Sequence, residues 1–183
     1  MLVYRIGKWG ITMEIDTQVL RQAMRNWATG VTIVTSFATS AAGVEKAGAT
    51  VSSFTSVALD PPTVLVCLNK GTYVHEVIQR SGVYAVSMLG LDQEALSNRF
   101  AGTDPLVTDR FAGLQALTLQ TGSPLIPGAL AWLDCRVTQT LDTGTHSVFL
   151  ANVVDVQVNS MGAPLVYYNR SYKHLVDPIR ETS

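Results

Sequence analysis

Strand-like segments lie at both ends of this chain, and they restrict its fold more than any other feature. After residue 129 the sequence alternates between long β-type segments and short turns, at 142–144 and 160–162. Long β segments joined by turns favour a mainly β fold, a β-barrel with flanking α-helices, over the βαβ alternation of a doubly wound sheet. The predicted strands are 31–37, 49–59, 63–69, 83–89, 129–141, 147–158 and 164–169.

Three modest helices are predicted from apolar spacing and from the residues that begin or end helices. The first helix has an apolar face that consists of Val19, Leu20, Ala23, Met24 and Trp27. A loop containing Ser40, Gly43 and Gly48 is expected between the first two strands. The helices are 16–29 with Asp16 as N-cap and Gly30 as stop, 72–80 ending at Gly82, and 92–100 with Asp92 as cap and 101–102 as its end.

The 183 residues fit one domain, because 47% are apolar and only 15% are charged. We expect an N-terminal extension over 1–15, a single domain over 16–177 and a tail over 178–183. The net charge of −1 without a basic run argues against nucleic acid as a partner. The sequence has neither a signal-peptide pattern nor a membrane-spanning apolar run, so a soluble, cytoplasmic protein without a membrane partner is expected.

Several common catalytic sites are absent from the sequence. It contains no Gly-x-Gly-x-x-Gly motif after a strand, as a Rossmann nucleotide site requires, and no Gly-x-Ser-x-Gly elbow. The histidines are dispersed and unaccompanied by paired cysteines, so no metal site is predicted, and Cys67 and Cys135 are expected to be reduced, packed thiols. A β-rich domain without acid, base or nucleophile motifs is typical of a protein whose cofactor carries the chemistry.

The most informative segment is ATVSSFTSVALDPPTVLVCLN, residues 49–69. Its hydroxyl groups stand beside backbone amides on a strand and the turn that follows, where they can bind the polar rim of a ring while apolar neighbours cover its face. From composition alone, an ordinary serine- and threonine-rich strand is the favoured interpretation. The hydroxyl residues are Thr50, Ser52, Ser53, Thr55 and Ser56.

In order and spacing, several segments of the chain resemble the flavin reductase-like family, the reductase components of two-component flavin monooxygenases. The resemblance covers about residues 17 to 175 and implies an FMN-binding split β-barrel that forms a homodimer, with the flavin near the subunit interface. The segments are ATGVTIVT, SSFTSVALDPP, SGVYAVSML, LSNRFAG, DRFAG, GALAWLDCRV, GTHSVFLANVVDV and PLVYYNRSY.

The resemblance also implies which residues contact the flavin. One strand would meet the ring and ribityl chain, the end of the next strand would line the flavin, and the following helix start would hold the phosphate, where free N–H groups suit an anion. Without the resemblance, a surface cation is the favoured interpretation of Arg99 and a core residue that of Phe100. Thr72 by itself is equally well explained as a helix cap. The implied flavin contacts are Thr50, Val51, Ser52, Ser53, Cys67, Leu68, Asn69, Thr72, Arg99, Phe100 and Tyr172.

For the nicotinamide side, the resemblance points to His146 as the catalytic residue. The family usually has Gly-Asp-His at this position, whereas this chain has Gly144, Thr145 and His146, so a hydroxyl replaces the carboxylate beside the imidazole. An exposed histidine near a turn is the alternative. Val74 stands where many relatives have a hydroxyl, which predicts fewer phosphate contacts or a different hold on FAD.

The expected activity is that of an NAD(P)H:flavin oxidoreductase that transfers a hydride from NADH or NADPH to FMN or FAD and supplies reduced flavin to a partner monooxygenase. Two alternatives remain open. One is a flavin-binding electron-transfer protein that does not use free NAD(P)H, which the missing acid before His146 favours. The other is a split-barrel binding module without redox work, which the hydroxyl-rich strand disfavours.

Overall fold

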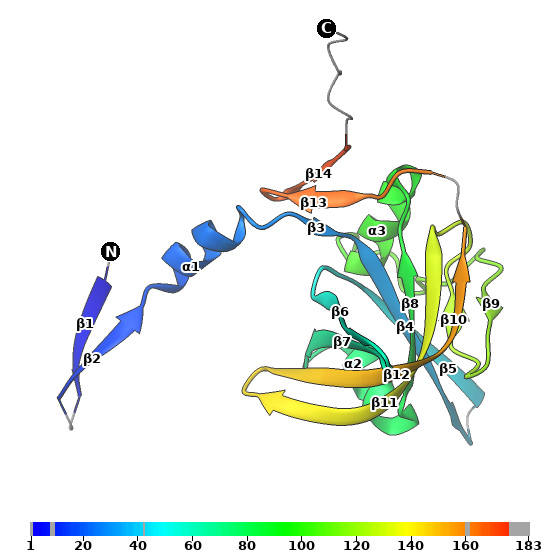
Figure 1. Cartoon of the computed structure of the whole chain (residues 1–183), viewed down its shortest axis with the longest axis horizontal. Coiled ribbons are helices and arrows are strands. Elements are labelled where there is room, and N and C mark those ends of the chain that lie inside the picture. The colour runs from blue at the N-terminus through cyan, green and yellow to red at the C-terminus, as the bar shows by residue number, and fades with distance from the viewer. Residues whose placement is uncertain (1, 8–9, 42, 160–161, 176–183) are drawn as a thin grey trace, which may run out of the picture.

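The computed structural model describes residues 2–7, 10–41, 43–159 and 162–175, and a seven-stranded antiparallel sheet forms its body (Figure 1). The strand order is β5-β4-β8-β11-β12-β7-β6, and neither edge strand pairs with the other. The sheet is therefore curved but not closed, which confirms the predicted split-barrel form of a mainly β fold. The strands are β4 (Thr32–Ser40), β5 (Gly43–Val51), β6 (Phe54–Leu59), β7 (Pro62–Asn69), β8 (Val83–Met88), β11 (Ala131–Thr143) and β12 (His146–Val158).

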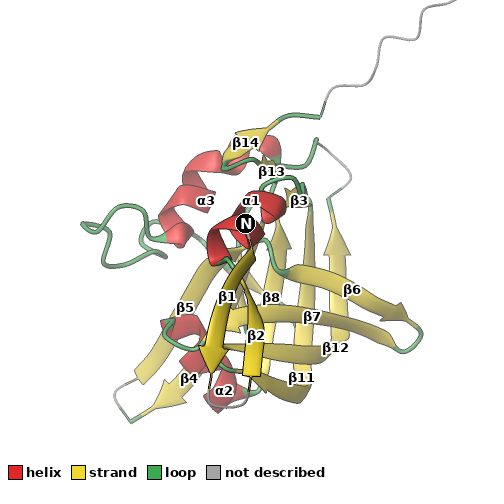
Figure 2. Cartoon of the chain, turned by 90° about the vertical axis from the view of Figure 1, so that its left-hand side faces the viewer, coloured by secondary structure: helices red, strands yellow, loops and turns green. Residues whose placement is uncertain are grey.

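Two helices lie against this sheet. α2 (Tyr73–Ser81) packs on β4 and β5, and α3 (Glu94–Ala101) packs on β5 (Figure 2). Each ends at a glycine with positive φ, 69° at Gly82 and 70° at Gly102, where a side chain would strain the backbone. A 3-10 turn, η1 (Leu91–Gln93), precedes α3. Both helices thus line the barrel near the β5 edge.

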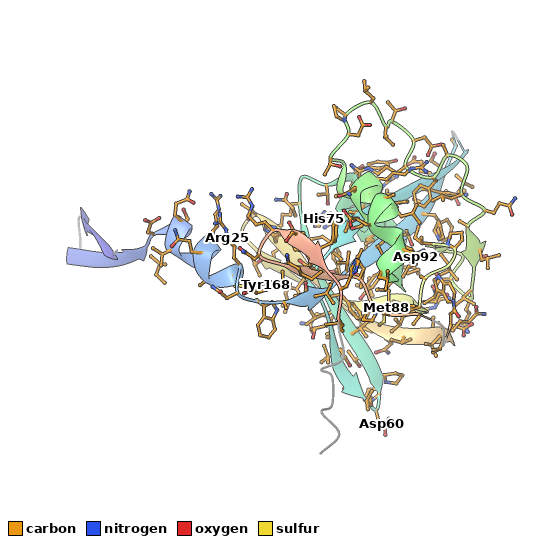
Figure 3. All side chains as sticks on the ribbon, turned by 90° about the horizontal axis from the view of Figure 1, so that it is seen from above. Arg25, Asp60, His75, Met88, Asp92 and Tyr168 are labelled. Carbon is orange, nitrogen blue, oxygen red and sulfur yellow. The ribbon has the colours of Figure 1, made fainter. Side chains whose placement is uncertain are left out.

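The amino-terminal residues form an arm outside the sheet. A hairpin of β1 (Leu2–Gly7) and β2 (Gly10–Ile15) leads into α1 (Thr17–Met24), and the arm projects from the body (Figure 1). The backbone N–H of Asn169 donates to the carbonyl of Arg25 at 3.1 Å, which joins the end of α1 to a small sheet above the barrel (Figure 3). The small sheet contains β3 (Thr29–Gly30), β13 (Val166–Tyr168) and β14 (Ser171–Lys173), and β9 (Leu117–Thr118) pairs with β10 (Pro124–Leu125).

The main core lies between the sheet and α2, and a second cluster lies under α3. Tyr84, Phe149 and Ile78 are among the largest fully buried side chains of the main core, and Phe100 and Leu165 are buried in the second cluster. Both cysteines are free, as predicted, and burial raises the pKa of the Cys135 thiol. Among the described residues, no helix has the length and apolar character needed to cross a membrane.

The structure corrects several predicted element boundaries. The loop expected over 40–48 is largely strand, because β5 begins at Gly43 and its pairing with β4 supplies the backbone hydrogen bonds. The strand expected over 49–59 is interrupted at Ser52 and Ser53, where the chain passes from one edge of the sheet to the other. β11 runs through Thr143, so the turn predicted at 142–144 is confined to Gly144 and Thr145.

The helix predictions also need correction at their ends. α1 stops at Met24, well before Gly30; a turn at 25–26 follows, and Gly30 lies in the short strand β3. Asp16 is its N-cap as predicted, accepting a hydrogen bond from the N–H of Gln18 at 2.8 Å. Asp92 does not cap α3 but lies in η1. Residues 1–15 contain the β1–β2 hairpin, and the predicted tail over 178–183 lies outside the described residues.

Candidate functional site

The serine- and threonine-rich edge is open in the structure. Thr50 and Val51, at the end of β5, are half-buried, and Ser52 and Ser53, which connect β5 to β6, are exposed. Because β5 and β6 are the two edges of the sheet, this connection crosses the gap in the barrel. The gap has room beside it, since two cavities adjoin Thr50.

Most hydroxyl groups at this edge are already engaged by the protein. Thr50 Oγ1 donates to the carbonyl of Ser97 on α3 at 2.6 Å, and Ser53 Oγ donates to the carbonyl of Cys67 at 2.6 Å. These two bonds hold the edge against α3 and β7. Among the described residues, Ser52 has no hydrogen-bond partner for its side chain, which leaves that hydroxyl available to a ligand.

The first cavity, which we name the Thr72 cavity, has a volume of about 560 Å³. It lies between β5, the start of α2, and the segment after α3, and the first N–H groups of α2 on its wall have no acceptor within the helix. Thr72 is the N-cap, but its hydroxyl donates to the carbonyl of Asn69 at 2.7 Å, so the backbone amides are the better anion donors. Its walls include Lys46, Gly48, Thr50, Val74, Phe100 and Arg110.

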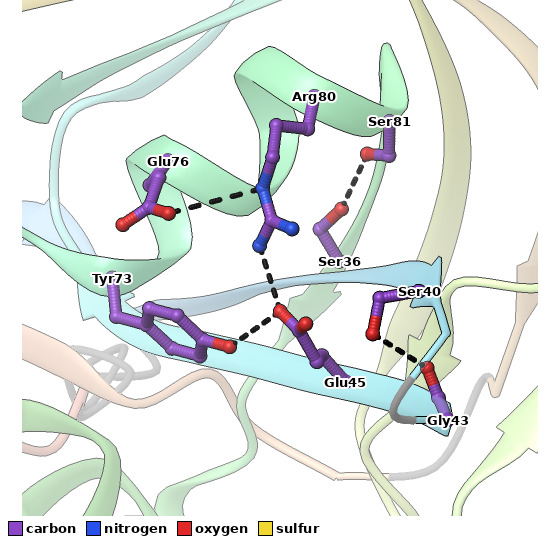
Figure 4. A network of polar contacts seen from close by, with 8 residues as sticks. All are labelled: Ser36, Ser40, Gly43, Glu45, Tyr73, Glu76, Arg80 and Ser81. Atoms are coloured by element: carbon purple, nitrogen blue, oxygen red, sulfur yellow. Dashed lines mark hydrogen bonds and ion pairs between the residues drawn. The ribbon is translucent and has the colours of Figure 1, made fainter.

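A polar network fixes the two walls of the Thr72 cavity relative to each other. Glu45 on β5 accepts hydrogen bonds at 2.7 Å from both Arg80 and Tyr73 on α2 (Figure 4). The hydrogen bond from Arg80, followed by that from Tyr73, lowers the pKa of Glu45 to about 2. The carboxylate is therefore ionised throughout the physiological range, and the start of α2 is held over β5.

Two arginines near this cavity have different roles in the structure. Arg99, which the family resemblance implies as a contact on the flavin phosphate or adenosine side, donates from Nη2 to the carbonyls of Asp109 and Ala112, at 3.2 and 2.6 Å. It lines neither of the two cavities beside Thr50. Arg110 lines the Thr72 cavity, and its Nη1 donates to the carbonyls of Gly48 and Phe100, at 3.0 and 2.9 Å. Carbonyls do not neutralise a guanidinium, so Arg110 supplies positive charge to the cavity.

Sequence reasoning missed Arg110 as a site residue, although the DRFAG segment that contains it was part of the family resemblance. Among the described residues, no carboxylate forms an ion pair with it. The sequence feature that could have pointed to Arg110 is the second Arg-Phe pair, in DRF, beside the one in NRF. The fold of the loop between the two pairs places Arg110, and not Arg99, in the wall of the cavity.

Phe100 forms the floor of the Thr72 cavity. Its ring is fully buried and meets Phe111 edge-on, with ring centroids 5.1 Å apart. A Cβ placed on Gly48 would lie 2.7 Å from Phe100 Cε1, which is closer than real Cβ atoms approach. Glycine at position 48 therefore lets β5 lie directly on the aromatic floor.

The second cavity, the Tyr172 cavity, has a volume of about 580 Å³ and lies on the other side of Thr50. Tyr172 Oη is 2.8 Å from Ser97 Oγ and 3.1 Å from Asn98 Oδ1, so the ring is fixed against α3. The two-residue turn that brings it there has positive φ at both Asn169 and Arg170, as the hairpin twist requires. The walls of the Tyr172 cavity include Val51, Ser52, Ser97 and Arg170.

The end of β7 and the start of β12 bring the remaining site residues together. Asn69 pairs with His146 in the ladder, and Cys67 pairs with Val148. Leu68, next to Cys67, is buried and belongs to the core. The imidazole of His146 is half-buried, and its Nδ1 lies 2.9 Å from Thr145 Oγ1, so the threonine hydroxyl takes the place of the family's carboxylate as the polar neighbour of this ring.

The sequence-derived site residues thus form two groups. The first adjoins the two cavities and comprises Thr50, Val51, Ser52, Thr72, Phe100 and Tyr172. The second, at the carboxyl end of β7, comprises Ser53, Cys67, Leu68, Asn69 and His146, and the bond from Ser53 to Cys67 joins it to the edge. Arg99 lies apart from both, on the loop side of α3. Each cavity falls within the range of small-molecule sites, about 300–1,000 Å³.

Known proteins are similar to this chain in sequence and in fold over most of its length. The FMN reductase (NADH) RutF of Acinetobacter baylyi is 40% identical over 160 residues, which is 87% of this chain and 82% of that protein. The reductase component of a 4-nitrophenol 4-monooxygenase/4-nitrocatechol 2-monooxygenase from Rhodococcus opacus is 38% identical over 169 residues, covering 92% of this chain and 86% of that protein.

A solved structure agrees with these relatives. The NADH:FAD oxidoreductase SgcE6 of Streptomyces globisporus, in complex with NAD and FAD fragments, superposes with a TM-score of 0.80 at 30% identity, covering 90% of this chain and 95% of that one. The family model described as "Flavin reductase like domain" matches residues 24–176, and with it every sequence-derived site residue. The chain belongs to the flavin reductase-like family.

Proposed function

We propose that this protein is an NAD(P)H:flavin oxidoreductase that reduces FMN or FAD with NADH or NADPH. The observation that carries the proposal is the open edge at Thr50 to Ser53, which adjoins two cavities and stands beside the first amides of α2 and the guanidinium of Arg110. The relatives named as NADH-dependent reductases of FMN and FAD support the same reaction. When bound, a flavin accepts a hydride at N5 from C4 of the reduced nicotinamide and so carries the redox chemistry.

The residues of the chain would bind and orient the flavin. The phosphate would lie in the Thr72 cavity, held by the first amides of α2 and by Arg110, above Phe100. Ser52 and the backbone of Thr50, Val51 and Ser53 would meet the polar rim and ribityl chain. The negative charge of the flavin phosphate would then lie beside the N–H groups of α2 and the guanidinium of Arg110.

The remaining assigned residues would act around this cradle. Cys67 and Asn69 would line the flavin from the end of β7, whereas the side chain of Leu68 is buried in the core and only its backbone could do so. Tyr172 would lie near the edge of the flavin in the second cavity. Arg99 would contribute by holding the loop through Asp109 and Ala112, because its guanidinium is committed to those carbonyls. His146 would position the nicotinamide over the flavin, so that the two rings react as an oriented pair, an arrangement that is worth several kcal/mol of barrier.

The test is the oxidation of NADH and of NADPH by purified protein, with and without added FMN or FAD. We expect oxidation that depends on added flavin, followed as loss of the nicotinamide absorbance, because amino-acid side chains with both cysteines as free thiols cannot accept a hydride. A yellow protein that is inert to both nicotinamides would instead indicate electron transfer, and a colourless protein that binds no flavin would indicate a binding module.

The reduced flavin is proposed to leave for a partner monooxygenase. The related reductase component from Rhodococcus opacus supports this role. Flavin then behaves as a substrate, so its affinity is expected to be modest and the purified protein only faintly yellow. We also propose that the protein is cytoplasmic, where NADH and NADPH are available.

We further propose that the protein is a homodimer. All residues of α1 are exposed, among them the apolar face formed by Val19, Leu20 and Met24, and Trp27 beyond its end is 68% exposed. A large apolar patch on an arm that projects from the body is typical of a protein interface. A second copy would cover this face.

The expected result is a dimer by analytical ultracentrifugation, because burying the α1 face removes apolar surface from water. Replacing Leu20 and Met24 together by glutamate should give a monomer, since charged groups in the interface lose hydration. Gln22→Glu, on the polar side of the same helix, is the control and should remain dimeric. A wild-type monomer at micromolar concentration would contradict the proposal.

A further inference from the structure

A chain of four polar side chains lies behind the second group of site residues. His75 Nε2 is 2.9 Å from Ser147 Oγ, Ser147 Oγ donates to Asp142 Oδ1 at 2.8 Å, and Lys70 Nζ is 3.3 Å from the same carboxylate oxygen. We name these four residues the Asp142 relay. It joins the turn after β7, the first turn of α2 and both strands of the β11–β12 hairpin.

Three relay members are close in sequence to residues assigned to the site. Lys70 follows Asn69, Ser147 follows His146, and His75 is one helical turn after Thr72. In a strand, neighbouring side chains point to opposite faces. Ser147 is accordingly buried where His146 is half-buried, and His75 is buried beside it, whereas the side chains of Lys70 and Asp142 are 37% and 68% exposed. The buried half of the relay therefore supports the site from the interior side of the same backbone.

The carboxylate of Asp142, at one end of the relay, determines which group donates in each of the hydrogen bonds. The ionised carboxylate of Asp142 can only accept, so the single hydroxyl proton of Ser147 is directed to it. Ser147 Oγ must then accept from His75, which requires the proton of neutral His75 to be on Nε2. The relay is thereby satisfied in one orientation only, and it fixes both the tautomer and the direction of the ring.

The surroundings of His75 favour its neutral form. The side chain is 5% exposed and lies edge-on to Phe149, with ring centroids 5.1 Å apart. Burial lowers the pKa of His75, the charge of Lys70 lowers it further, and Asp142 opposes both effects. Lys70 and Asp142 are the charged groups that face it, and they come from the turn after β7 and from β11.

The hairpin that carries His146 has little conformational freedom at its turn. Thr143 pairs with His146 across a turn of only two residues, and the backbone N–H of Lys70 donates to the carbonyl of Thr145 at 3.0 Å. A movement of α2 relative to this hairpin would therefore have to break the contact between His75 and Ser147. The relay couples the phosphate end of the site to the nicotinamide end.

We propose that the Asp142 relay positions His146 and the start of α2 for hydride transfer, with His75 and Ser147 as its positioning residues. This inference rests on the proposed flavin reductase function. Neither residue touches the ligands, because Ser147 is fully buried and His75 faces the core. Their effect is on the rate of transfer within the bound complex rather than on the affinity for flavin.

The relay also gives the reduction rate a pH dependence with a defined sign. Because burial, and after it the charge of Lys70, lowers the pKa of His75 in the closed arrangement, a state in which His75 is released to solvent binds the proton more readily. The closed arrangement is therefore fully favoured above the ordinary histidine pKa of about 6.5 and loses stability as the pH falls below it. The reduction rate should fall on the acid side.

The experiment measures flavin reduction by NADH in stopped flow between pH 5 and 8, together with the affinity for FMN. In the wild type we expect the rate to fall several-fold below about pH 6.5. His75→Gln keeps a donor toward Ser147 but cannot titrate, so this acid limb should disappear. Ser147→Ala should lower the rate about fivefold at every pH, the effect of one lost hydrogen bond, with FMN affinity unchanged.

Thr138→Val is the matched control, because Thr138 donates a hydroxyl hydrogen bond to the carbonyl of Leu150 in the same hairpin, away from the relay. It should leave rate and pH profile unchanged. A His75→Gln variant that retains the acid limb, or a Ser147→Ala variant that loses FMN affinity and rate equally, would overturn the positioning role.

A second measurement does not depend on turnover. In ¹⁵N-labelled protein the imidazole spectrum of neutral His75 should report the proton on Nε2, and Ser147→Ala should shift the resonances of both His75 and His146. A proton on Nδ1, or an unaltered His146 signal, would overturn the relay. A wild type that reduces no flavin would refute the proposed function, and these spectra would still decide whether the relay exists.

Discussion

Replacing Arg110 by glutamine should weaken the binding of FMN by roughly tenfold to a hundredfold and leave the binding of riboflavin almost unchanged. Hydrogen bonds to charged groups contribute about 1.5–3 kcal/mol, and riboflavin differs from FMN only in lacking the phosphate. The comparison of the two ligands separates the charge of Arg110 from its structural bonds to Gly48 and Phe100, which both ligands need equally. Fluorescence quenching of each flavin measures the affinities.

Arg136→Gln is the matched control for this experiment. Arg136 is an exposed cation on β11 outside both cavities, so the same chemical change there should affect neither ligand. Equal losses for FMN and riboflavin in Arg110→Gln would mean that Arg110 only shapes the Thr72 cavity. Unchanged FMN affinity would locate the phosphate elsewhere.

Gly48→Ala should destabilise the protein by about 1–3 kcal/mol, because the added methyl group would meet the buried ring of Phe100 at 2.7 Å and Thr35 Cγ2 at 3.2 Å. The ring is fully buried and packed edge-on against Phe111, so moving it away from the new methyl group would disturb that contact. The backbone at position 48 lies outside the left-handed region, so the cost is steric alone. Urea unfolding measures it as a lower midpoint.

Gly30→Ala provides the comparison at a second glycine. A Cβ there has nothing within 4 Å, and the smaller entropy of the unfolded alanine chain should leave the stability unchanged or slightly higher. If both variants unfold at the wild-type midpoint, then β5 can move away from Phe100, and the floor of the Thr72 cavity is not rigid.

The elements with strong local signals could be predicted from the sequence. The apolar run of β7 and the helix α2 with Gly82 at its end were identified closely, because strand composition and a left-handed stop are local properties. β5 was predicted too short, since Gly43 and Gly48 suggest a loop and only the pairing with β4 makes that segment a strand.

The site was less accessible to sequence reasoning, because it is assembled from distant segments. The two arginines of NRF and DRF are equivalent as sequence, and only the fold of the loop between them turns Arg99 toward carbonyls and Arg110 toward the cavity. The contact between His75 and Ser147 joins residues 72 positions apart. Neither arrangement has a local pattern, whereas the hydroxyl-rich segment around Ser52 does.

The gap in the barrel has a further consequence for the behaviour of the molecule in solution. Within the part of the chain that the structure describes, β5 and β6 each carry one row of backbone groups without a neighbouring strand, and Ser52 and Ser53 connect the two strands. Bare strand margins of this kind recruit strands from other molecules and promote aggregation. Whatever occupies the gap therefore also shields it, and solubility and ligand occupancy become linked properties of this fold.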